Sequence, residues 1–118
     1  MGAWGAGIFD DDTALDVRGI FEESLAEGST PVRATELALE EFGECLEDPD
    51  DGPVVVLAIA SLLLERGVAN HPIQAAAIDL LKSGEGLERW AEAGPESLAE
   101  RRAVYADLLG KLQSAGAG

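Results

Sequence analysis

Carboxylates are the side chains in this sequence whose spacing suggests chemistry, and one cluster of them stands close to the N-terminus. Its members are Asp10, Asp11, Asp12 and Asp16. A helix would place Asp12 and Asp16 on one face, where oxygen atoms from the acidic segment 48–51 would complete a site for Mg²⁺ or Ca²⁺. The register of an EF-hand loop is absent, and aspartates at a helix start also cap free backbone amides. Asp12 and Asp16 are therefore candidate metal ligands, and helix capping is the alternative interpretation.

A second acidic pattern follows in the segment that begins at Thr30-Pro31, where a threonine cap and a proline predict a helix start. Glu36, Glu40 and Glu44 recur at every fourth position and so lie on one helix face, with Glu41 and Glu47 beside it. Like charges at this spacing destabilise a helix by a few tenths of a kcal/mol per pair. We therefore expect a ridge that binds a basic protein partner; a solvated face that aids solubility is the alternative.

Overall charge limits the classes of partner. The 118 residues include 23 acidic and 8 basic side chains, which gives a net charge of −15, and residues 10–51 alone hold 15 acidic and 2 basic ones. Such a chain repels phosphate groups, so we expect it to bind neither nucleic acids nor anionic membrane surfaces. The composition favours a basic protein as the partner.

Other chemistry is largely excluded by what the chain lacks. It contains one cysteine and one histidine, too few for a four-ligand Cys/His zinc site. No GxSxG, Walker or HExxH motif occurs, so we predict no catalytic residues and no cofactor. No basic segment followed by an apolar run opens the sequence, and no apolar run is long enough to span a bilayer as a helix. The expected location is the cytoplasm.

The element that must organise the chain is the apolar segment at about 53–66. Val54 to Leu64 contains no charged residue, which is typical of an element without a solvent face. Its valines also suit a buried strand, but its length exceeds that of most strands. Pro53 at the start and Gly67 after the end match helix boundaries. The segment is therefore predicted to be a buried central helix.

The rest of the chain predicts one all-α domain over residues 1–118, with five or six short helices packed around the central one. The first helix is expected to bury Leu15, Ile20, Phe21 and Leu25. We expect the glycine-rich segment 1–9 to be ordered by burial of Trp4 and Phe9, and Trp90 and Tyr105 to pack in the core. The last helix is predicted to end near Gln113, which leaves 114–118 as a frayed tail.

The N-terminal segment MGAWGAGIFDDDTALD resembles the opening of a bacterial family, domain of unknown function 4259. The matching residues are Gly2, Ala3, Trp4, Gly5, Gly7, Phe9, Asp10, Asp12, Ala14 and Asp16. The resemblance implies a small all-α domain of bacterial origin. It implies no activity, and no catalytic residue is carried over.

Three functions are compatible with these patterns. The leading hypothesis is a non-enzymatic interaction module that binds a basic protein, in the manner of an immunity protein or antitoxin. The second is a divalent-metal binder or a small metal-dependent enzyme that uses the aspartates near the N-terminus. The third is a structural homo-oligomer that buries a helix face, for instance the one between Leu98 and Leu112.

Overall fold

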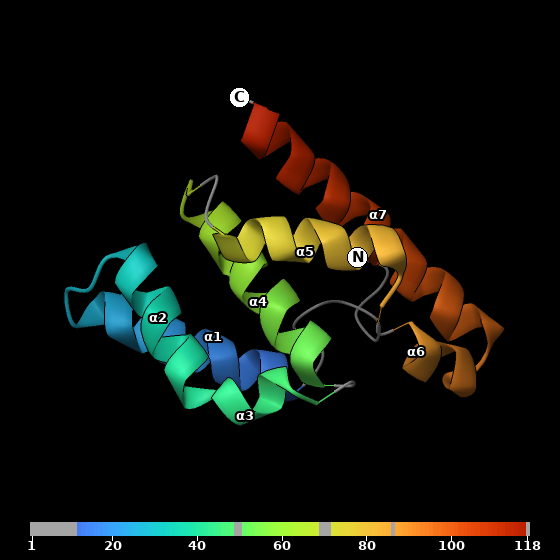
Figure 1. Cartoon of the computed structure of the whole chain (residues 1–118), viewed down its shortest axis with the longest axis horizontal. Helices are drawn as coiled ribbons and strands as arrows, with labels where there is room; N and C mark the ends of the chain where they lie inside the picture. The colour runs from blue at the N-terminus through green and yellow to red at the C-terminus, as the bar shows by residue number, and fades with distance from the viewer. Residues whose placement is uncertain (1–11, 49–50, 69–71, 86, 118) are drawn as a thin grey trace.

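Helix α4 (Asp51–Glu65) lies at the centre of the computed structural model, with other helices on both sides of it (Figure 1). Its side chains from Val54 to Leu63 are buried, apart from Val56 and Ser61, which are partly exposed. A helix enclosed on two sides has no polar stripe, which explains why this segment is apolar all round. The predicted buried central helix is confirmed.

The structure describes residues 12–48, 51–68, 72–85 and 87–117, and within these ranges it contains helices and no strand. The helices in these ranges are α1 (Asp12–Ala26), α2 (Pro31–Glu41), α3 (Gly43–Leu46), α4 (Asp51–Glu65), α5 (Pro72–Ser83), α6 (Glu88–Ala93) and α7 (Pro95–Ala117). The predicted all-α class is confirmed. Among the described helices, none combines the length and the apolar character needed to cross a membrane.

One side of α4 packs against α1, α2 and α3. Ala14, Val17 and Phe21 of α1 are fully buried there, and Val55 and Ile59 of α4 belong to the same core cluster. The expectation that Leu15 points inward is wrong, because 49% of this residue is exposed. The buried face of α1 instead runs through Ala14, Val17 and Phe21.

The opposite side of α4 packs against α5 and α7. Leu57 and Ala60 of α4 lie in this second core cluster with Tyr105, Leu108 and Leu112 of α7. The apolar face of α7 is thus covered within the same chain. This is the face that the sequence offered for homo-oligomerisation, and Leu108 and Leu112 on it are only 6% and 3% exposed.

Helix boundaries follow the predicted local signals. Thr30 caps α2, its Oγ1 accepting a hydrogen bond from the Arg33 backbone N–H at 3.1 Å. Helix α4 ends at Glu65, and Gly67 just beyond it has a φ of 74°, in the left-handed region that glycine tolerates best. The next residue, Val68, donates its backbone N–H to the Leu63 carbonyl at 2.9 Å, which closes a Schellman motif.

Two elements differ from the sequence-based expectation. The helix predicted from Pro31 onward is interrupted at Phe42, so that α2 and α3 are separate helices. Phe42 is followed by Gly43, a poor helix former, and α3 is repositioned so that it packs against α4. At the other end of the chain, α7 continues through Ala117, so most of the segment expected to be a frayed tail is helical.

Candidate functional site

A groove runs along the surface between α1 and α2, and acidic side chains line both of its walls. It consists of two adjoining hollows of about 320 and 430 Å³, which share Ile20, Glu23 and Glu41 in their lining. We call it the α1–α2 groove. Its carboxylates are Asp16, Glu23 and Glu27 from α1 and Glu40 and Glu41 from α2. Its apolar side chains are Leu15, Ile20, Leu37 and Phe42.

The spacing of the α1 residues explains why they share one wall. Glu23 and Glu27 are one turn apart, and Asp16 precedes Glu23 by two turns, which is about 10 Å along a helix at 1.5 Å per residue. Helix α2 lies alongside α1 and supplies the opposite wall. The groove therefore holds a strip of negative charge that follows the helix axis, beside apolar contact area that includes the half-exposed Leu15.

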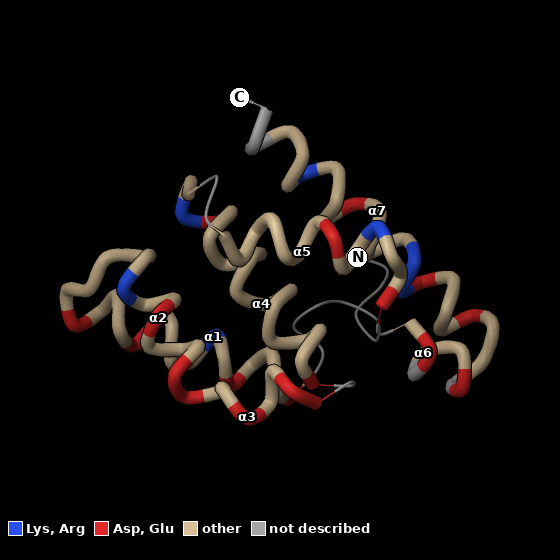
Figure 2. Tube along the Cα trace, viewed as in Figure 1, with Lys and Arg blue, Asp and Glu red and all other residues tan. Residues whose placement is uncertain are grey.

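Other acidic residues of α1 and α4 are paired with arginines. Glu22 pairs with Arg18 at 3.2 Å and with Arg66 at 3.7 Å, and Arg18 also reaches Glu65 at 3.6 Å. In contrast, the five groove carboxylates make no ion pair with any of the residues that the structure describes. The groove is therefore a surface of uncompensated negative charge, and Figure 2 shows the acidic residues of α1 and α2 from which it is built.

The structure separates the four glutamates that the sequence predicts as one ridge. All four are exposed, but Glu36 and Glu40 lie in α2, Glu44 lies in α3, and Glu47 follows α3. Glu36 also pairs with Arg33 at 3.3 Å. The single continuous ridge is therefore wrong, because the helix that would carry it breaks at Phe42. Only Glu40 of the four lines the α1–α2 groove.

Sequence reasoning placed Glu41 beside the predicted ridge but missed Glu23 and Glu27 as members of this site. The spacing of Asp16, Glu23 and Glu27 is a signal for one helix face, and it is visible in the sequence. What the sequence did not show is that α2 places Glu40 and Glu41 across from that face.

The metal hypothesis gains no support from the described residues. Asp12 and Asp16 are both exposed on α1, and no group of three or more potential ligands is found among the residues that the structure describes. Asp10, Asp11 and Asp50 lie outside the described residues, as does His71. Cys45 is a free thiol that packs, half-buried, against the first core cluster.

The family motif also lies mostly outside the described residues: Gly2, Trp4, Gly5, Gly7, Phe9 and Asp10 precede the first of them, whereas Asp12 and Asp16 lie in α1. The family model described as domain of unknown function (DUF4259) matches residues 2–115. The chain belongs to this family. The comparisons with curated proteins and with solved structures found no match.

The second half of this DUF4259 domain contains a buried arginine that the sequence analysis did not single out. Arg101 is 2% exposed, and its guanidinium lies 5.0 Å from the ring centre of Trp90 and 5.4 Å from that of Tyr105. Burial raises the pKa of Tyr105, and the nearby Arg101 charge offsets part of that effect. The position of Arg101 one turn before Tyr105 was the available signal for its inward direction. This cluster joins α6 to α7.

Proposed function

We propose that this protein is a non-enzymatic interaction module that binds a basic protein through the α1–α2 groove. The observation that carries the proposal is the gathering of five carboxylates from two helices along one groove. Glu22, Glu36 and Glu65 pair with arginines, whereas Asp16, Glu23, Glu27, Glu40 and Glu41 gather along one groove without an ion pair to any described residue.

Physical reasons favour a basic protein over other partners. Complementary charge accelerates association and excludes wrong partners, while the apolar strip beside the carboxylates offers contact area to apolar side chains. Lysine and arginine suit such a surface, since their hydrocarbon stems cover apolar atoms while their charges meet carboxylates. An immunity- or antitoxin-like role is one form that this activity would take.

The test is affinity capture from a lysate of the source organism, with two charge-reversed variants as comparisons. The groove variant carries Glu23→Lys, Glu40→Lys and Glu41→Lys. The control carries Glu88→Lys, Glu92→Lys and Glu96→Lys, which are exposed positions on α6 and α7, so both variants change the net charge equally. Captures are run at about 50 and 500 mM salt, because the Debye length falls to about 4 Å at the higher value.

The proposal predicts a basic protein that the wild type and the control retain at low salt and that the groove variant loses. The captured protein is then purified and mixed with each variant to confirm direct binding. Equal loss with both variants would show that net charge alone attracts the partner. That result, or the absence of any captured basic protein, contradicts the proposal.

A further inference from the structure

Gly19 leaves a gap in the α1 wall of the α1–α2 groove. It lies in the middle of α1 and is exposed, and it lines the hollow of about 430 Å³ at the Leu15 end of the groove. Glycine destabilises a helix interior relative to alanine, because its backbone loses more conformational freedom on folding. A Cβ atom at this position would meet no atom of another described helix within 4 Å. Packing within the described chain therefore does not require glycine at position 19.

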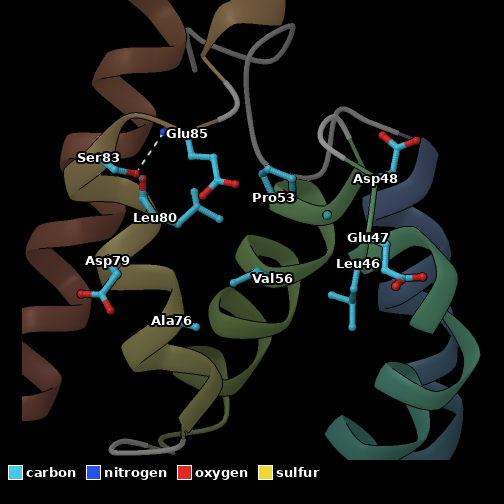
Figure 3. Close-up of a pocket in the computed structure, with 11 residues that line it drawn as sticks. Leu46, Glu47, Asp48, Pro53, Val56, Ala76, Asp79, Leu80, Ser83 and Glu85 are labelled. Carbon is cyan, nitrogen blue, oxygen red and sulfur yellow. Dashed lines mark hydrogen bonds between the residues drawn. The ribbon is translucent and has the colours of Figure 1, made fainter.

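Two other helical glycines lie in different settings. Gly52 lines a hollow between α3 and α5, in which Figure 3 shows the Asp79 carboxylate turned away from the space. A Cβ atom at Gly52 would lie 2.7 Å from the Leu46 carbonyl oxygen, so contacts within the chain explain that glycine. Gly110 is exposed and without close neighbours, as Gly19 is, but the hollow beside it is lined by residues of α7 alone. Only Gly19 of the three combines free space with a facing helix.

The residues around Gly19 have the spacing of a socket for a side chain of another helix. Asp16, Gly19, Ile20 and Glu23 stand at positions i, i+3, i+4 and i+7 of α1, and all four line the hollow. In knobs-into-holes packing, a side chain of a facing helix inserts between four residues with this spacing. Phe42, which follows α2 and is half-buried, closes the hollow from the other side. We call the four residues of α1 the Gly19 socket.

We propose that the basic partner presents an α-helix that crosses α1 at the Gly19 socket. This inference rests on the proposed function, since it describes how the partner lies in the same groove. Without a side chain at Gly19, the partner helix can approach the α1 backbone closely. Leu15, which is 49% exposed, and Ile20 offer apolar contact area there, while Asp16 and Glu23 suit basic residues of the helix. Strand addition is the main other mode, and the described residues include no strand that could pair with one.

The test measures binding and stability together, using the basic protein that the wild type captures at low salt, after its purification. Gly19→Ala should weaken binding by about threefold and Gly19→Leu by at least about tenfold, because the added atoms hold the partner helix away from α1. Both substitutions should raise the melting temperature by up to about 5 °C, since alanine and leucine favour a helix over glycine. Gly110→Leu is the matched control: it should also raise the melting temperature but bind the partner as the wild type does.

A pair of synthetic peptides tests the helical mode by itself. Both contain about 18 residues, or five helical turns, and share one composition of leucine, lysine and alanine. In the first peptide the leucines recur every three or four residues, which gathers them on one helix face, and in the second they alternate with lysine. By fluorescence anisotropy, the first should bind the wild type at least about tenfold more tightly than the second and should lose this advantage with Gly19→Leu.

The outcomes separate this inference from the proposed function. If the groove variant loses the partner but Gly19→Leu retains it, the proposed function stands and the close approach at Gly19 is wrong. Equal weakening by Gly19→Leu and Gly110→Leu would assign the loss to any added surface leucine. Equal binding of the two peptides would mean attraction by charge alone, and tighter binding of the alternating peptide would assign the groove to an extended segment. If no basic protein is captured, the proposed function fails and this inference fails with it.

Discussion

Gly52 gives the sharpest test of how α3 is joined to the central helix. It is buried in the first turn of α4, and a Cβ atom at this position would lie 2.7 Å from the carbonyl oxygen of Leu46 and 3.4 Å from that of Cys45. Real Cβ atoms do not approach backbone oxygens at 2.7 Å, and a backbone carbonyl cannot rotate away as a side chain can. The variant Gly52→Ala therefore forces α3 and α4 apart.

The expected magnitude combines two opposing effects. Alanine is favoured over glycine inside a helix by up to about 1 kcal/mol, whereas overpacking a well-packed site typically costs about 1–3 kcal/mol. Since the atoms that must move are backbone, we expect the second effect to dominate and the free energy of unfolding to fall by about 1–2 kcal/mol. This corresponds to a decrease in melting temperature of roughly 5–10 °C for a domain of this size.

Gly110→Ala is the matched control. Gly110 lies within α7, and a Cβ atom added to it would meet no atom of another element within 4 Å, so the same substitution should raise the free energy of unfolding by up to about 1 kcal/mol. Urea denaturation followed by far-UV circular dichroism measures both variants. If Gly52→Ala proves as stable as the wild type or more stable, the close contact between α3 and α4 is refuted.

Two further predictions concern the core. Leu62 is 1% exposed, so Leu62→Ala should lower the free energy of unfolding by about 2–5 kcal/mol. Leu15 is half-exposed, so Leu15→Ala should change the free energy of unfolding by less than about 1 kcal/mol. Equal losses of stability in urea denaturation would contradict the orientation of α1. The single tyrosine of the chain, Tyr105, should ionise above its ordinary pKa of 10.0 in the folded protein, because burial raises the pKa. The folded state then holds the proton more tightly than the unfolded state, so this contribution to stability is present below pH 10 and is lost as the pH rises through the folded pKa. Ultraviolet titration with and without urea checks this, and identical midpoints would contradict it.

Local signals in the sequence were sufficient to predict the central helix α4 and the start of α2. The uncharged run that contains Val54–Leu64, with a proline at its start and a glycine after its end, predicts a buried helix because only an enclosed element tolerates apolar residues on all sides. Thr30 and Gly67 act through local backbone hydrogen bonds, which depend on neighbours in sequence alone. These local signals predict the helix ends correctly because they do not depend on contacts between residues far apart in the sequence.

The extent of a helix, and the side of it that faces the core, also depend on contacts with residues far away in the sequence. The i, i+4 spacing of Glu36, Glu40 and Glu44 predicts one ridge, but the helix is interrupted at Phe42 and α3 packs against α4. Leu15 looked suitable for the core by hydropathy, yet the neighbouring Ala14 is the residue that the first core cluster buries.

The sequence by itself determined the all-α class, the central helix and the concentration of acidic residues between 10 and 51. Only the tertiary structure decided which of those acids share a groove and which are paired. Glu22 meets Arg66 only because the end of α4 lies beside α1, and Glu40 stands across from Glu23 only because α2 lies beside α1. The physical reason is that the charge of a side chain follows from its residue type, whereas its interaction with an opposite charge depends on the distance between the two groups. That distance is set by the packing of helices that are far apart in the sequence.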